Sequence, residues 1–164
     1  MNDPISPRGT APAPAERLSV EEETVWRSLG RVVQRLPRTV DSIMLRSTGL
    51  TMTEFSVLDA LRDNPQHTLR ISDLAAVTGL SASRVSRVVD SMATRGWCRR
   101  ERDATDGRAA LAKLTEEGLA TAGTASAFHV EVAREYVLAH VPAEARHAFI
   151  TVLAAIAEHA GETR

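Results

Sequence analysis

The segment 71–114 constrains the fold more than any other part of the chain. Two helical patterns come first, at 71–78 and 81–96, with a short glycine-containing turn between them. Two strand-length pieces follow, WCRRER and AALAKL, on either side of an Asp106-Gly107 pair that strongly favours a hairpin turn. A helix, a turn, a second helix and a hairpin in this order predict a winged helix-turn-helix.

The second of these helices has two different faces. Apolar residues recur at the i, i+3, i+4 and i+7 spacing of one helix face: Val85, Val88, Val89 and Met92. The other positions carry hydroxyl and guanidinium groups: Ser83, Arg84, Ser86, Arg87 and Ser91. The helix start holds no acidic residue, and Ser81 is a favourable N-cap. In the preceding helix, we expect Leu74, Ala75 and Val77 to point inward.

Basic residues are concentrated in the middle of the chain. Between Arg70 and Lys113 there are nine basic and five acidic residues, a net charge of +4. The whole chain of 164 residues carries −1, so the remainder carries −5. This asymmetry is typical of a nucleic-acid-binding module set into a larger protein.

Long helical patterns flank the winged helix-turn-helix, which we place at 51–114. We expect dimerisation helices at 19–48 and 115–160, because their apolar stripes are too long for one small domain to cover. Capping signals start the segments at Ser19, Thr51 and Thr115. Pro37 predicts a kink or a break near Leu36. After Pro142 a final helix carries an apolar stripe of Ala145, Phe149, Val152 and Ile156. Residues 1–18, with four prolines, are expected to form a disordered tail.

These elements predict a mainly α-helical chain with a small β-hairpin wing, an α+β arrangement. The second helix of a helix-turn-helix enters the major groove of DNA, where guanidinium groups and hydroxyls bind bases and phosphates. The DNA-contacting residues that we predict from the helix and the hairpin are Ser81, Ser83, Arg84, Ser86, Arg87, Arg100 and Arg108. Asp106 is expected to stabilise the wing by pairing with Arg100 or Arg102.

Three quoted stretches resemble the MarR family of bacterial transcriptional regulators: LTMTEFSVLDAL, ISDLAAVTGLSASRVSRVVDSMATRGWCRR and RDATDGRAALAKLTEEG. The most specific part is the spacing from Gly96 through Arg100 to the wing turn, then Leu114 and Gly118. The likeness covers the domain at 19–160. In the family the wing usually reads Asp-Arg-Arg, whereas this chain has glycine at 107 and so lacks one basic contact.

The resemblance implies a homodimer that binds double-stranded DNA at a palindromic operator, in most members as a repressor. Many members release DNA when a small phenolic or anionic ligand binds between the dimer helices and the DNA-binding lobe. The residues that we expect to line such a pocket are Trp26, Leu29, Arg46, Phe55 and Phe128. The alternative is a winged-helix module that binds a partner protein in place of specific DNA.

Other functions have less support in the sequence. We find no phosphate-binding loop, nucleophile elbow or His/carboxylate motif, and therefore do not predict an enzyme or a cofactor. The single Cys98 excludes an intramolecular disulfide and is expected to be an inert buried thiol. The five histidines lack metal-ligand spacing, so no metal site is expected. Without a signal peptide or a membrane-spanning stretch, we expect a cytoplasmic protein.

Overall fold

The computed structural model describes residues 17–102 and 109–162. The chain divides into two compact units, 1–35 and 36–164, and the first helix begins in one and ends in the other. The helices are α1 (Val20–Thr48), α2 (Met52–Asp63), α3 (Ile71–Thr78), α4 (Ala82–Thr94), α5 (Glu116–Tyr136) and α6 (Arg146–Glu162). The strands are β1 (Thr68–Arg70), β2 (Cys98–Arg102) and β3 (Ala110–Leu114), and short 3-10 turns occupy Leu138–His140 and Ala143–Ala145.

The capping signals are confirmed, and they explain where several helices begin. In the first unit, the Ser19 amide donates to the Glu22 carboxylate and the Ser19 hydroxyl accepts from the Glu22 amide. Thr51 and Glu54 form the same reciprocal pair at the start of α2. The hydroxyls of Ser81 and Thr115 cap α4 and α5 with single bonds. Each cap satisfies a backbone amide that the helix itself leaves unpaired.

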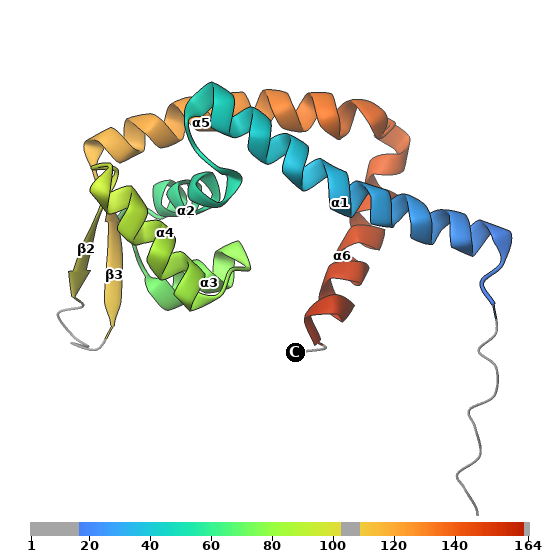
Figure 1. Cartoon of the computed structure of the whole chain (residues 1–164), viewed down its shortest axis with the longest axis horizontal. Coiled ribbons are helices and arrows are strands. Elements are labelled where there is room, and N and C mark those ends of the chain that lie inside the picture. The colour runs from blue at the N-terminus through green and yellow to red at the C-terminus, as the bar shows by residue number, and fades with distance from the viewer. Residues whose placement is uncertain (1–16, 103–108, 163–164) are drawn as a thin grey trace, which may run out of the picture. The chain divides into compact units, whose positions relative to one another are not determined.

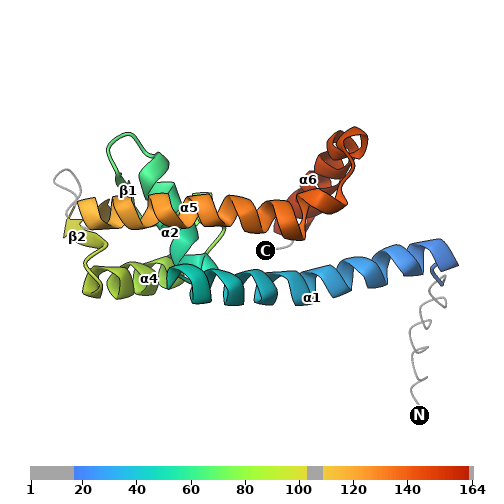
Figure 2. The same cartoon turned by 90° about the horizontal axis from the view of Figure 1, so that it is seen from above.

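The core of the second unit lies where α2, α3, α4 and α5 meet the sheet. Its fully buried members include Met44, Leu50, Leu58, Leu61, Leu74, Val85, Val89, Met92, Ala112 and Ala122. Helix α2 packs against α5, and α4 packs against β2 (Figure 2). The apolar face predicted for 81–96 is therefore the face of α4 that packs against this core.

The antiparallel pairing of the two predicted wing strands is confirmed, with an additional strand beside them, while the predicted turn at Asp106-Gly107 lies outside the described residues. β2 and β3 pair antiparallel from Cys98 opposite Leu114 to Arg102 opposite Ala110, and they lie side by side next to α4 (Figure 1). β1 joins the other edge of β3, giving the order β1-β3-β2. Sequence reasoning missed β1, because three residues carry too little pattern to indicate a strand.

One local expectation, for Val77, is wrong, and of the kink or break expected near Leu36 the break does not occur. Val77 is 66% exposed, because the buried face of α3 follows Ile71, Leu74, Ala75 and Thr78 and leaves Val77 beside it. The chain does not break at Pro37, since α1 continues through it to Thr48. A helix can absorb one proline by losing a single backbone hydrogen bond and bending.

Two other predictions concern the ends of the chain. The final helix begins at Arg146, after the 3-10 turn that follows Pro142. Residues 1–16, most of the expected tail 1–18, lie outside the described part of the chain. Within the described residues, no helix combines the length and the apolar character that are needed to cross a membrane.

Candidate nucleic-acid interface

Helix α4 presents a polar face opposite the face that is buried in the core. Val85, Val89 and Met92 are fully buried, whereas Ser83, Arg84 and Arg87 are exposed. The first turn of the helix contains no acidic residue. The Ser81 hydroxyl accepts a 3.3 Å hydrogen bond from the Arg84 amide, which fixes the helix start. The positive end of the helix dipole and two arginines therefore share one exposed surface, which suits an anionic ligand.

Arg84 also reaches back to the start of α2. Its Nη2 donates to the Thr53 hydroxyl at 3.2 Å. Beside this contact lies an open hollow of about 760 Å³. It is lined by residues of α4, of the start of α2 and of the second-unit part of α1. Its charged lining residues are Arg38, Asp41, Glu54, Arg84 and Arg87. The two arginines that we predicted to read bases thus also border a hollow of small-molecule size.

Arg100 joins the wing to α4. Its Nη1 donates to the Ser86 hydroxyl and to the Asp90 carboxylate, each at 2.8 Å. Ser86 and Asp90 stand one helical turn apart, so a single guanidinium nitrogen spans both. The structure thus brings together Ser86 and Arg100, two residues predicted separately. The pairing of Asp106 with Arg100 or Arg102 stays a prediction, because 103–108, including Arg108, lies outside the described residues.

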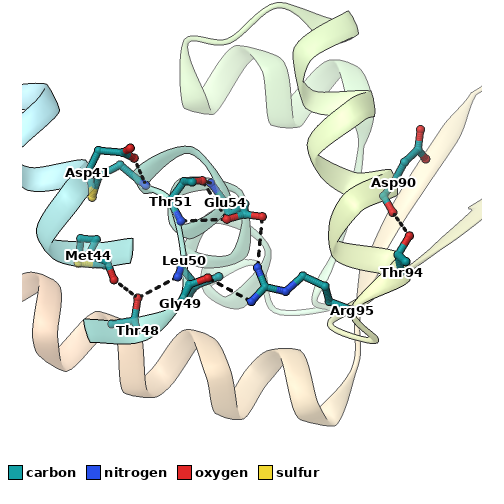
Figure 3. A network of polar contacts seen from close by, with 11 residues as sticks. Asp41, Met44, Thr48, Gly49, Leu50, Thr51, Glu54, Asp90, Thr94 and Arg95 are labelled. Atoms are coloured by element: carbon teal, nitrogen blue, oxygen red, sulfur yellow. Dashed lines mark hydrogen bonds and ion pairs between the residues drawn. The ribbon is translucent and has the colours of Figure 1, made fainter. Parts of the chain in front are cut away.

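The end of α4 is attached to the α1–α2 corner by Arg95, which the sequence analysis did not single out. Its Nη2 donates to the Gly49 carbonyl at 3.1 Å, and its Nη1 lies 3.5 Å from Glu54 Oε1 (Figure 3). Its guanidinium carbon also lies 3.5 Å from the centre of the Trp97 ring, a cation–π geometry. Arg95 is the C-cap residue of α4 and precedes Gly96, whose φ is 79°, but the sequence around it carries no signal for these long-range contacts.

A second set of bonds in Figure 3 orders the corner itself. Asp41 of α1 accepts from the Met52 amide at 2.8 Å. The Thr48 hydroxyl donates to the Met44 carbonyl and accepts from the Leu50 amide. These bonds satisfy backbone groups at the end of α1 and the start of α2. The corner that receives Arg95 is therefore itself fixed by side chains.

The predicted ligand-pocket residues fall in both units of the chain. Trp26, 66% exposed, and Leu29 belong to the first unit. In the second unit Arg46 is exposed and donates to the Ser42 hydroxyl. Phe55 is buried with its ring 4.7 Å from that of His129, and Phe128 packs against the core. Their role in binding a ligand stays a prediction.

Cys98 is the first residue of β2 and is buried against α4. The thiol is buried and donates to the Val89 carbonyl at 3.4 Å. Burial, with a smaller contribution from the negative charge of Asp90, raises the pKa of the Cys98 thiol to about 11. The thiol is therefore protonated at neutral pH and a poor nucleophile. Among the described residues, no group of three His, Cys, Asp or Glu side chains is arranged to hold a metal ion.

The fold and the α4 surface define a winged helix-turn-helix protein. Residues 48–109 match the model of the MarR family. AbsC, a MarR family transcriptional regulator from Streptomyces coelicolor, is 30% identical with a TM-score of 0.83, over 90% of this chain and 99% of AbsC. The chain therefore belongs to the MarR family of transcriptional regulators.

Two further relatives extend the comparison. Sco3205, a MarR family regulator from Streptomyces coelicolor solved in complex with DNA, has a TM-score of 0.83 and 28% identity, over 91% of this chain and 92% of Sco3205. The transcriptional repressor MprA of Escherichia coli (strain K12) is 32% identical over 75 residues, 46% of this chain. The matched segment spans only 43% of the length of MprA.

Proposed function

We propose that the protein is a homodimeric, sequence-specific, double-stranded DNA-binding regulator that represses transcription in the cytoplasm of a bacterium. One observation carries the proposal: α4 buries Val85, Val89 and Met92 in the core and exposes Ser83, Arg84 and Arg87, with no acid in its first turn. Such a surface is matched to the major groove, where acidic side chains are repelled by phosphate. The activity is binding, with no catalytic step.

Five of the seven predicted DNA contacts have a chemical task of their own, and Ser86 and Arg100 are considered together below. Ser81 and Ser83, small residues at the helix start, allow the backbone to approach a phosphate. Arg84 and Arg87 present donor forks to guanine O6 and N7. Arg108 on the wing is expected to enter the minor groove, where a narrow groove attracts a guanidinium. In this proposal, Arg84 leaves Thr53 when it engages a base.

Exposed apolar residues on α6 support the homodimer. Phe149, Ile150, Val152, Leu153 and Ile156 are each at least 40% exposed in the single chain. A contiguous apolar surface of this kind is typical of an interface. In a dimer, the two copies of α4 meet successive major grooves about 34 Å apart on a palindromic site.

The hollow beside α4 supports regulation by a small anionic ligand. Arg38, Arg84 and Arg87 offer donors for a carboxylate, and a ligand there occupies both predicted base-reading arginines. DNA and ligand then compete for the same side chains. A binding titration with an aromatic carboxylate, on wild type and Arg38→Ala, tests this: the variant loses the ligand response and keeps its DNA affinity if the hollow is the site.

The experiment that tests the main proposal is selection of random duplex DNA by the purified protein, with an Arg84→Ala/Arg87→Ala double variant alongside. We expect the wild type alone to enrich a palindromic motif. If both proteins are folded and neither enriches a motif, the proposal fails and a partner-binding module takes its place.

A further inference from the structure

The bond between Arg100 and Ser86 restricts what the Ser86 hydroxyl offers to a ligand. A serine hydroxyl has one hydrogen to donate and two lone pairs that accept. A guanidinium only donates, so the Ser86 oxygen is the acceptor in the 2.8 Å contact with Arg100 Nη1. The positive charge of Arg100 repels the hydroxyl hydrogen, which therefore rotates away from it. Ser86 is left with its donor available for another group.

Asp90 keeps Arg100 in this position. Asp90 is the one acidic residue of α4, and its carboxylate lies 2.8 Å from the same nitrogen of Arg100. The ion pair offsets a negative charge that would otherwise repel phosphate, and together with Ser86 it occupies Nη1 of Arg100 at the root of the wing. The register of β2 holds Arg100 opposite Ala112, so the hairpin fixes where the side chain starts.

We propose that Arg100 is a positioning residue, not a DNA contact, and that it makes Ser86 a hydrogen-bond donor to one base edge. This rests on the proposed function of α4 as the helix in the major groove. There, guanine, adenine and thymine each present an acceptor atom, whereas cytosine presents only its N4 amino donor. A donor at Ser86 therefore discriminates against cytosine at one position of each half-site.

A competing fate for the Ser86 hydrogen is visible on the same helix. The Thr94 hydroxyl donates to the Asp90 carbonyl one turn earlier, at 3.0 Å. Such bonding to the helix backbone would take the hydrogen away from the groove. If Ser86 behaved like Thr94, its removal would leave base preference unchanged, which makes the two fates distinguishable.

The test compares dissociation constants for the motif selected by the wild type and for duplexes with cytosine placed at each position in turn. The variants are Ser86→Ala and the pair Arg100→Met/Asp90→Asn, which removes both charges and leaves the net charge unchanged. Arg99→Met is the matched control, because adjacent residues of a strand point to opposite faces. Thermal melting confirms that each variant is folded.

We expect Ser86→Ala to reduce discrimination against cytosine roughly three- to tenfold at one position per half-site, the effect of one neutral hydrogen bond. Arg100→Met/Asp90→Asn lowers the discrimination against cytosine at that same position. Adding Ser86→Ala to that pair lowers the discrimination no further. Binding to scrambled DNA and its salt dependence stay as in the wild type. Arg99→Met does not change the preference at that position.

Two results overturn the inference. In the first, Ser86→Ala retains the full preference at every position. In the second, Arg100→Met/Asp90→Asn weakens all sequences equally and lowers the salt slope by about one per subunit, which identifies Arg100 as a phosphate contact. In both cases the wild type still selects a motif. If the wild type selects none, the proposed function fails, and this inference fails with it.

Discussion

The guanidinium of Arg95 lies 3.5 Å from the centre of the Trp97 ring and donates to the Gly49 carbonyl at 3.1 Å. Arg95 stands at the end of α4, whereas Gly49 stands where α1 ends. One side chain thus connects the helix that we assign to DNA with the corner between α1 and α2. The contact spans 46 residues of sequence and fixes the C-terminal end of α4.

Replacing Arg95 by alanine should lower the free energy of unfolding by about 1–2 kcal/mol. The change removes a cation–π contact and a hydrogen bond to a backbone carbonyl. Chemical denaturation measures the effect. Arg87→Ala, an exposed arginine on the same helix, is the control and should change stability by less than about 0.5 kcal/mol. Equal stability of the two variants would show that the Arg95 contacts contribute nothing.

Gly118 is required by a close backbone approach. Gly118 lies in the first turn of α5, and a Cβ at this position would be 1.9 Å from the Trp97 carbonyl oxygen. Gly118→Ala therefore forces a backbone shift, and we expect a loss of about 3 kcal/mol in unfolding free energy. Gly123, on the same helix, has no atom within 4 Å of its Cβ position. Gly123→Ala should stabilise the protein by up to about 1 kcal/mol, and equal effects of the two variants would contradict the geometry.

The buried thiol makes stability depend on pH in the alkaline range. The pKa of Cys98 is about 11 in the folded chain against an ordinary value of 9.0, first because of burial and then because of Asp90. The folded state therefore holds its proton between pH 9 and 11, where the unfolded state has lost it. This contribution to stability is complete below pH 9 and is lost as pH rises toward 11.

Two measurements check this expectation. Denaturation curves at pH 8 and pH 11 should show that the free energy of unfolding falls more for the wild type than for Cys98→Ala as the pH rises. A disulfide reagent at pH 8 should label Cys98 slowly in the native protein and rapidly in denaturant. Rapid labelling of the native protein would mean that the thiol is accessible and ionised.

The exposed apolar surface of α6 gives a test of the homodimer. Ile150 is 63% exposed in the single chain, and Ile150→Glu places a charge within that surface. We expect the dimer dissociation constant to rise at least tenfold, about 1.4 kcal/mol, as measured by sedimentation equilibrium. Val77→Glu, on an exposed position of α3, should leave the oligomeric state unchanged. A fully dimeric Ile150→Glu protein would place the interface elsewhere.

What the sequence predicted well is local. The caps at Thr51, Ser81 and Thr115 were read correctly, because each depends on residues within a single turn. The buried face of α4 was likewise correct, since its period is a property of the helix alone.

What it missed depends on contacts between distant segments. Arg95 and Glu54 are 41 residues apart, and nothing near either residue indicates the other. The three residues of β1 form a strand only because β3 pairs with them. The exposure of Val77 follows from how the short helix α3 sits on the core, which an apolar residue count does not reveal.

The central claim is that α4 reads DNA sequence through Arg84 and Arg87. The most direct measurement is the dissociation constant of wild type and of each single alanine variant for the selected motif and for scrambled duplex, over a series of salt concentrations. We expect the wild type to prefer its motif by about 10³-fold or more, with affinity falling steeply as salt rises. Each variant should lose about 1–3 kcal/mol on the motif and far less on scrambled DNA. Equal wild-type affinity for both duplexes, with little dependence on salt, would contradict the claim.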